Sequence, residues 1–239
     1  MELAPWITLV VVTLWVMTIG RNAIIRFWSA LARVASQPIA APISVALLAL
    51  AFGVIPLLHN HAPIPSVHDE FANLLAADTF AHGRLANPPP PLWEHFETVH
   101  ELMRPSYASK FPPGEGLMLA VGKVLGCAAL GSIATIAIAC AMIVVALRHW
   151  LPPRWALVGG LLAAAHPMTF QWGQSYWGGG VAMLGGALLG GAALRAFGRS
   201  GGTAVALAAT LHYRIVLQFQ GLGPGFCCSC NAFWRRVSS

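Results

Sequence analysis

Charged side chains are scarce in this sequence. Only 9% of its 239 residues are Asp, Glu, Lys or Arg, whereas 57% are hydrophobic, and the mean hydropathy is +0.67. Soluble globular domains carry about 25% charged residues, so this composition excludes an ordinary soluble domain. Several apolar runs approach or exceed the ~20 residues with which a helix crosses a bilayer. They are too long and too uniformly apolar for barrel strands, and we therefore expect an all-α, polytopic membrane protein.

Acidic residues are nearly missing outside one segment. Residues 59–115 hold seven of the eight acids and six of the nine histidines. Three bases against seven acids give this segment a net charge of −4, while the remainder, with eleven bases and one acid, carries +10. Chemistry that needs a carboxylate must therefore take place in or beside 59–115. The bases elsewhere lie singly or in small groups between apolar runs, which argues against a nucleic-acid partner.

Five apolar runs and a weaker sixth make up most of the remaining chain. They cover 3–20, 39–58, 117–147, 155–170 and 178–194, and the sixth candidate starts at Thr203. No Lys or Arg precedes the first run, so the basic region of a secretory signal is missing and we expect the run to remain as a helix. The stretch 22–37 is expected to lie along the membrane interface. The sequence thus predicts five to six transmembrane helices.

Basic links alternate with links in which basic residues are few or outnumbered by acids. Arg21–Arg33, Arg148–Arg154 and Arg195–Arg199 alternate with 59–115 and Gln171–Trp177. Because cytoplasmic loops are enriched in Lys and Arg, this order places the N-terminus and the acidic loop on the outer side. We expect a multi-pass protein of the bacterial cytoplasmic (inner) membrane, with loop 59–115 facing outward.

The end of the chain departs from this pattern. Three of the five cysteines lie in the last thirteen residues, without the paired spacing of a structural zinc site. Polar residues enter the sixth candidate run, and no further long apolar run follows. We therefore expect a membrane domain over 1–210 and an atypical, truncated or frameshifted tail over 211–239. We also expect these 239 residues to be inactive by themselves.

An acid pair, Asp69 and Glu70, directly follows the second run. Ser66 is predicted to cap a helix that continues to His82 and ends at Gly83. This helix would be amphipathic and lie on the outer membrane surface, with an apolar stripe formed by Phe71, Leu74, Leu75 and Phe80. Acids in a first helical turn often only complement the helix dipole. Their place beside a span, in the acid-rich segment, also makes them candidate functional groups.

Two further groups of polar and aromatic residues lie on the predicted outer side. Glu94, Glu97 and Glu101 would share one face of a short helix, which is either a solvated surface or, with His95 or His100, a weak candidate for a divalent ion. No metal site is predicted, and a divalent cofactor is left open. The aromatic residues of the 171–177 link either form an interfacial belt or stack on sugars.

Lys110 precedes two prolines that stiffen the loop before the third run. Its ammonium would lie near the lipid headgroups, where it could pair with a phosphate or simply extend toward water. The acid pair, the helix after it and the Lys-Phe-Pro-Pro-Gly stretch 110–114 resemble the C-type glycosyltransferases. The resemblance is strongest to the bacterial branch related to protein O-mannosyltransferases and aminoarabinose transferases. It covers about residues 38–205 and includes the Ser-Tyr-Trp-Gly-Gly stretch 175–179.

The resemblance implies that Asp69 is the catalytic base and that Lys110 contacts the phosphate of a polyprenyl-linked sugar donor. A basic residue of the aminoarabinose branch is replaced here by Ala72, so phosphate binding would lean on Arg84 or Arg104. The candidate site comprises Asp69 and Glu70 for catalysis, and Lys110, Arg84, Arg104, Tyr107, Tyr176 and Trp177 for substrate binding.

The implied function is transfer of a sugar from a polyprenyl-phosphate donor to an acceptor of unknown identity, at the outer face of the membrane, with membrane lipid as the other partner. The alternative is a non-enzymatic membrane module, such as a transporter half or an assembly factor, with 59–115 as a binding surface. Transporters usually carry ionisable groups in mid-span. Here Lys123, near the start of the third run, is the one acidic or basic residue in such a position, which favours chemistry at the interface.

Overall fold

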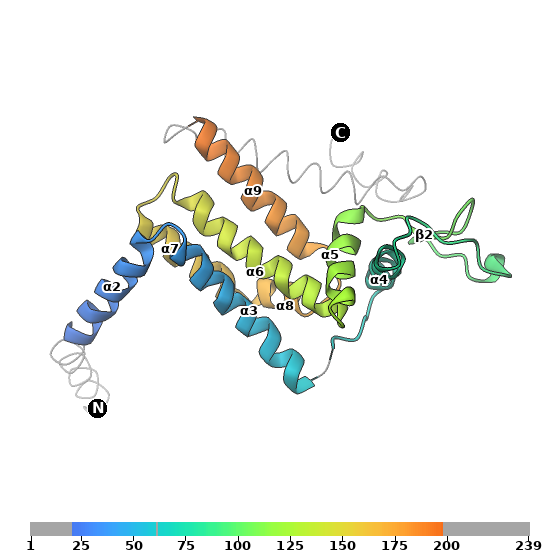
Figure 1. Ribbon diagram of the computed structural model, residues 1–239, viewed down its shortest axis with the longest axis horizontal. Helices are drawn as coiled ribbons and strands as arrows, with labels where there is room; N and C mark the ends of the chain where they lie inside the picture. Colours follow the sequence, from blue (N-terminus) through green and yellow to red (C-terminus); the bar gives the residue numbers. More distant parts are fainter. Residues whose placement is uncertain (1–20, 61, 198–239) are drawn as a thin grey trace, which may run out of the picture.

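Helices make up most of the described part of the chain, as the sequence predicts (Figure 1). The computed structural model describes residues 21–60 and 62–197, so the first and sixth runs and the tail lie outside the described residues. The eight described α-helices are α2 (Arg21–Ser36), α3 (Ala40–Asn60), α4 (His68–Ala81), α5 (Pro113–Val124), α6 (Ala128–Leu147), α7 (Pro153–Ala165), α8 (Pro167–Gly173) and α9 (Gly179–Phe197). A two-stranded antiparallel sheet, β1 (Glu101–Leu102) with β2 (Ala108–Ser109), is a small departure from the all-α expectation.

Three of the described helices are long and apolar enough to cross a membrane. The candidate spans are Ala40–His59, Ala128–Leu147 and Gly179–Ala196, with mean hydropathies of 2.3, 2.5 and 1.3. They correspond to α3, α6 and α9. This length and composition indicate a membrane protein, and the helices expected from the second and fifth runs are confirmed.

The third and fourth runs are each divided into two helices, so that in the third run the candidate span is α6 alone, and the described helices of the fourth run include no candidate span. The third is divided into α5 and α6 at Gly126, whose φ of +106° is unfavourable for any residue with a Cβ. The fourth is divided at Pro167, which begins α8 at a position where its missing N–H costs nothing. With 13 residues, α7 is about 20 Å long, less than the ~30 Å hydrocarbon core.

Side-chain contacts fix the directions of the long helices. Arg148, which follows α6, donates to the carbonyl oxygen of Gln37 before α3 at 2.9 Å, so α3 and α6 are antiparallel. In α9, Gly180 lies against Ile136 and Gly191 against Ala146, so α6 and α9 run in the same direction. Figure 1 shows the result, with the α2 end and the α4–β2 end on opposite sides of the bundle.

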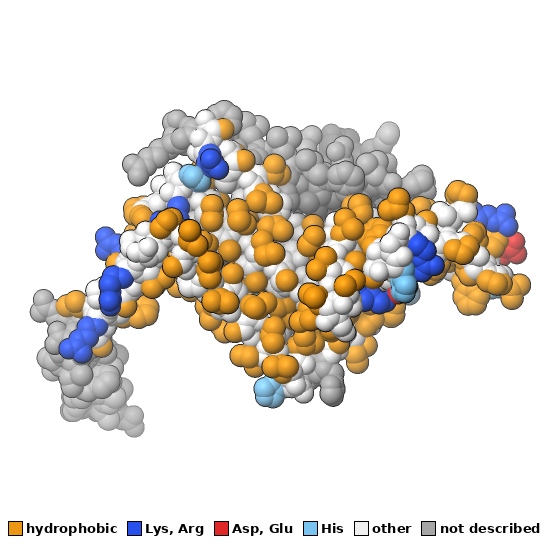
Figure 2. Space-filling view, in the orientation of Figure 1, with side chains coloured by type: hydrophobic (Ala, Val, Ile, Leu, Met, Phe, Trp, Pro, Cys, Tyr) orange, Lys and Arg blue, Asp and Glu red, His pale blue; other side chains and the backbone are white. Residues whose placement is uncertain are grey.

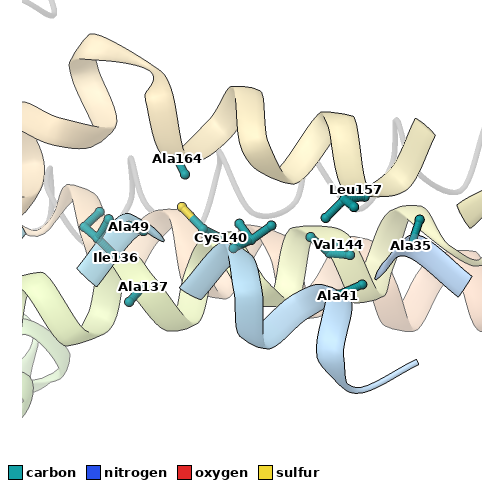
Figure 3. Packing of buried hydrophobic residues seen from close by; sticks show 10 residues of the cluster. Ala35, Ala41, Ala49, Ile136, Ala137, Cys140, Val144, Leu157 and Ala164 are labelled. Carbon is teal, nitrogen blue, oxygen red and sulfur yellow. The ribbon is translucent and has the colours of Figure 1, made fainter. Parts of the chain in front are cut away.

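Small side chains form much of the packed interior. Figure 3 shows the cluster in which Cys140 and Val144 of α6 and Leu157 of α7 are buried among alanines. Val45 of α3 belongs to the same cluster. Gly160 faces Val144 so closely that a Cβ would collide with it. Small residues let helices approach without a hydrophobic driving force between them, as in other membrane bundles.

Large apolar side chains cover the outside of this bundle. Figure 2 shows hydrophobic side chains over the middle of the molecule, with Lys and Arg gathered along α2 and at the α4–β2 end. Helix α2 covers most of the 22–37 stretch, whose interfacial position stays a prediction. Its Phe27 is largely exposed, and its Trp28 meets Trp155 of α7 edge to face, with ring centroids 6.4 Å apart. An apolar exterior with charged ends fits a lipid surround.

Candidate functional site

The candidate site lies at the end of the bundle where α4 packs against α5 (Figure 1). Ala76 of α4 faces Gly116 of α5 so closely that a Cβ on Gly116 would overlap its methyl group. Beneath this contact, Ala77, Leu119 and Tyr176 form a buried cluster. The buried residues of α4 are thus three alanines and three polar residues, while Phe71 of the predicted apolar stripe is exposed and its other three members are half-buried.

Helix α4 ends as predicted and begins differently. Gly83 adopts a φ of +70°, and the N–H groups of Gly83 and Arg84 donate to the carbonyl oxygens of Phe80 and Thr79, which forms a Schellman motif. The predicted cap by the Ser66 side chain is wrong, because the helix starts at His68 and no side chain at its N-cap makes a capping bond.

Glu70 performs the capping instead. Its Oε2 accepts hydrogen bonds from the Ser66 N–H (2.7 Å), the Ser66 hydroxyl (3.2 Å) and the Val67 N–H (3.3 Å). Its Oε1 accepts from the backbone N–H of Tyr176 (3.0 Å), and the residue is only 4% exposed. Burial alone would raise the pKa of Glu70, but the backbone donors outweigh it and hold the pKa below its usual range. Glu70 is thus a buried, ionised structural carboxylate.

Tyr176 ties the 171–177 link to the start of the loop. Its hydroxyl donates to the carbonyl oxygen of Pro63 (2.9 Å), and its own carbonyl oxygen accepts from the amide of Asn73 (3.0 Å). Its ring is buried. Together with the bond to Glu70, these contacts hold α4 against the bundle. The buried ring of Tyr176 therefore has a structural position and is not presented to a ligand.

Asp69 is the acid of the pair that remains available. Its side chain is 38% exposed. Oδ1 lies 3.1 Å from Nδ1 of His100, and Oδ2 lies 3.4 Å from the indole N–H of Trp177, which donates to it. Asp69 therefore has one donor beside each oxygen and still faces solvent, which is the arrangement that a general base at a surface needs.

Three rings stack beside Asp69. His100 lies between His68, with ring centroids 5.8 Å apart at 9°, and Phe111, with centroids 5.9 Å apart at 16°. His68 belongs to α4, His100 directly precedes β1, and Phe111 follows shortly after β2. From the sequence, His100 is only a weak candidate for a metal ligand, and no local signal links it to His68 or Phe111, because their contact depends on the hairpin.

The hairpin brings Lys110 to the same place. The N–H of Lys110 donates to the carbonyl oxygen of His100 (3.3 Å), one step beyond the pairing of Glu101 with Ser109. Further along, Asn87 and Tyr107 exchange two backbone hydrogen bonds (2.9 and 2.8 Å). His100 thus connects the two predicted site residues: its side chain lies beside Asp69, the predicted base, and its backbone is bonded to Lys110, the predicted phosphate contact.

Contacts with α4 secure this hairpin. The side-chain amide of Asn87 donates to the hydroxyl of Thr79 (2.7 Å), which itself donates to the carbonyl oxygen of Leu75. Tyr107 is half-buried, and burial raises its pKa, helped by the nearby carboxylate of Glu101. The predicted substrate contact Tyr107 therefore has a structural position in the hairpin.

The two predicted arginines have partners elsewhere. The guanidinium of Arg104 lies over the ring of Trp93, 4.2 Å from its centroid. Arg84 follows the end of α4, near Asp78, where a hydrogen bond from Lys123 keeps the pKa of Asp78 below its usual range. These contacts lie around the tip of the hairpin and the far end of α4, away from the first turn that carries Asp69.

The short helix expected over 94–101 is wrong. Residues Trp93–His95 form a single 3-10 turn, and Glu101 already belongs to β1. The carboxylates therefore do not share a helical face. Across residues 21–60 and 62–197, no three His, Cys, Asp or Glu side chains are grouped so that they could hold a metal ion.

Comparison with known proteins gives no relative from which a role could be transferred. No family model, no curated protein and no solved structure matches the chain. Its function is therefore inferred from the geometry of Asp69 and its neighbours.

Proposed function

We propose that the protein is a membrane glycosyltransferase that moves a sugar from a polyprenyl-phosphate donor to an acceptor at the outer face of a bacterial inner membrane. One observation carries the proposal. Asp69, a half-exposed carboxylate at the end of the bundle, lies 3.1 Å from His100, whose backbone is bonded to the Lys110 loop. A base and a cation next to a lipid surface are the groups that this transfer requires.

The reaction needs a base because a hydroxyl is a poor nucleophile at neutral pH. The acceptor oxygen attacks the anomeric carbon, its proton passes to the Asp69 carboxylate, and the bond from that carbon to the phosphate oxygen breaks. The polyprenyl phosphate leaves with the bonding electrons. A fixed cation near its oxygens lowers the energy of this charge, and Lys110 is the residue we assign to that task.

The environment of Glu70 favours direct displacement. A covalent mechanism would need a second carboxylate as nucleophile. Both oxygens of Glu70 accept hydrogen bonds from the backbone, and the side chain is buried. With Asp69 as the acting carboxylate, a single displacement inverts the configuration of the anomeric carbon.

Aromatic side chains next to Asp69 suit a sugar. Trp177 is 45% exposed, and its indole N–H points to Asp69. Phe111 is half-buried at the end of the ring stack. Ring faces at this position offer a stacking surface for a pyranose close to the base, which supports the assignment of Trp177 to substrate binding.

The proposed topology has five to six spans with the acidic loop outside. The three described candidate spans support a membrane location. Arg148 contacts the carbonyl oxygens of Ser36 and Gln37, so the basic links before α3 and after α6 lie together at the end opposite Asp69. The basic links at this end contain no acid, whereas the bases of loop 59–115 are outnumbered by seven acids, and this difference favours the former end as cytoplasmic.

Sugar transfer by membranes that contain the full-length protein tests the proposal. A polyprenyl-phosphate donor labelled in the sugar should lose its label to endogenous acceptors, and the product should carry the inverted anomeric configuration. Membranes without the protein are the control. Uptake or release of a solute without cleavage of the donor would instead identify the non-enzymatic membrane module and contradict the proposal.

A further inference from the structure

We infer that His100 is a positioning residue for Asp69, and that it orients the carboxylate through a hydrogen bond from its Nδ1 N–H. This inference rests on the proposed function, and it assigns a further residue to the same site. The role differs from the metal binding for which the sequence made His100 a candidate.

The first support is the position of the ring nitrogen. Nδ1 of His100 is buried, and within the described residues it makes no hydrogen bond of regular geometry. Oδ1 of Asp69 lies 3.1 Å from it, within bonding distance but off the N–H direction. A carboxylate oxygen only accepts, so the pair implies a proton on Nδ1. Catalytic hydrogen bonds are often misaligned without substrate and tighten when it binds.

The second support is that the ring is fixed independently of Asp69. His68 and Phe111 stack on its two sides, at centroid distances of 5.8 and 5.9 Å. The backbone of His100 is held by the hydrogen bond from the Lys110 N–H. A donor on a ring that cannot turn away presents a preorganised dipole to the carboxylate and needs little rearrangement during reaction.

The third support is that the two carboxylate oxygens of Asp69 face different donors. Trp177 donates to Oδ2 at the longer distance of 3.4 Å, and His100 faces Oδ1. Without the His100 donor, the Asp69 carboxylate would keep, from the described part of the chain, only this weak contact and could rotate about its side-chain bonds. Loss of a fixed direction for the base lowers the rate of proton transfer, while the donor lipid still binds.

Two substitutions separate the donor from the ring. His100→Phe keeps a ring between His68 and Phe111 and removes the N–H. His100→Asn removes the ring and offers an amide N–H at a similar distance from the backbone. In the full-length protein we expect kcat for His100→Phe to fall about 10- to 100-fold with little change in KM for the donor, and kcat for His100→Asn, which can donate but is no longer held by the stack, to fall less than that of His100→Phe.

A second pair of variants tests whether His100 acts through Asp69. Asp69→Asn and the double variant Asp69→Asn/His100→Phe should have the same residual rate, since an orienting group has nothing left to orient. The inference is overturned if His100→Phe is as active as wild type, or if it lowers the residual rate of Asp69→Asn further. It is also overturned if His100→Asn is no more active than His100→Phe, because a restored N–H donor would then give no benefit.

Failure of the proposed function would look different. If the wild-type protein transfers no sugar, the function itself is refuted before any His100 variant is compared, and the inference falls with it. If wild type is active and Asp69→Asn is not, only the comparison of the His100 variants decides the inference. Equal yields in the membrane and equal melting temperatures confirm that the variants are folded.

Discussion

The backbone N–H of Tyr176 donates a hydrogen bond to Oε1 of Glu70 at 3.0 Å, across 106 positions of sequence. This bond joins the link before α9 to the first turn of α4. The neighbouring acid, Asp69, has a half-exposed carboxylate, whose contacts within the described residues are the side chains of His100 and Trp177 and not backbone donors. Two adjacent acids thus differ in what they do, one stabilising the fold and the other facing solvent.

Substitution of Glu70 should therefore reduce stability more than substitution of Asp69. Glu70→Ala leaves buried N–H groups without an acceptor, and we expect a loss of about 2–3 kcal/mol, against less than ~1 kcal/mol for Asp69→Ala. Thermal unfolding in detergent measures the difference, with the exposed Glu97→Ala as control. Equal melting temperatures for Glu70→Ala and Glu97→Ala would contradict the structural role.

The contribution of Glu70 also has a defined dependence on pH. Its pKa in the folded protein lies below the ordinary value of 4.5. The stabilisation is therefore complete above pH 4.5 and is lost as the pH falls through the lower folded value. Wild type should lose stability on acidification in this range, whereas Glu70→Gln should lose less. An equal loss of stability in wild type and Glu70→Gln would argue against a stabilising role of the ionised Glu70 carboxylate.

Glu115, in the first turn of α5, should show the opposite dependence. Its burial, only partly offset by a hydrogen bond with Ser132, raises its pKa to about 8. Because the folded pKa lies above the ordinary 4.5, the stability is full below pH 4.5 and is lost as the pH rises through 8. Melting temperatures of wild type and Glu115→Gln should converge at pH 5 and diverge toward pH 8.5, with wild type lower. A difference in melting temperature between the two proteins that does not change with pH would contradict the raised pKa of Glu115.

The topology can be tested with cysteines at the two ends of the bundle. Leu85 is 88% exposed in the acidic loop, and His149 is exposed in the link between α6 and α7. In a background whose five cysteines are replaced by alanine, Leu85→Cys should react with an impermeant thiol reagent in intact cells. His149→Cys should react only after lysis. The reverse pattern would place Asp69 on the cytoplasmic side and refute the outward orientation.

Lys110 should matter for binding of the donor. Loss of a charge-assisted bond to phosphate weakens binding by about tenfold or more, so Lys110→Ala should raise the Kd for a polyprenyl phosphate accordingly. Lys110→Arg keeps the charge in a different geometry and should retain part of the affinity. Filter binding or fluorescence in nanodiscs gives the Kd. Equal affinity for wild type and Lys110→Ala would leave Lys110 as an interfacial lysine.

Local sequence signals predict some elements well and miss others for physical reasons. The apolar runs of α3 and α9 and the glycine end of α4 follow from hydropathy and from the φ of Gly83, which are local properties. Pro167 is also a local signal, and its preference for a first helical turn could have divided the fourth run. The break at Gly126 between α5 and α6 is harder to predict, because glycine is common within membrane helices and does not by itself indicate the end of one.

The candidate site was harder to anticipate because its contacts are distant in sequence. Asp69 could be singled out from its place after a span, but its neighbours His100 and Trp177 lie 31 and 108 positions away. The capping role of Glu70 depends in part on Tyr176, another distant residue. Local propensity favoured Ser66 as the cap, and only the tertiary arrangement shows that the carboxylate of Glu70 takes the N–H groups instead.

The measurement closest to the central claim compares sugar transfer and donor binding in one preparation of Asp69→Asn. The amide keeps the size of the side chain but cannot take a proton, so kcat should fall by about 10²–10⁴-fold while the Kd for the polyprenyl-phosphate sugar stays close to that of wild type. The exposed Glu97→Gln, in the same loop, should behave as wild type. Turnover by Asp69→Asn near the wild-type rate, with equal donor binding, would contradict the role of Asp69 as the catalytic base.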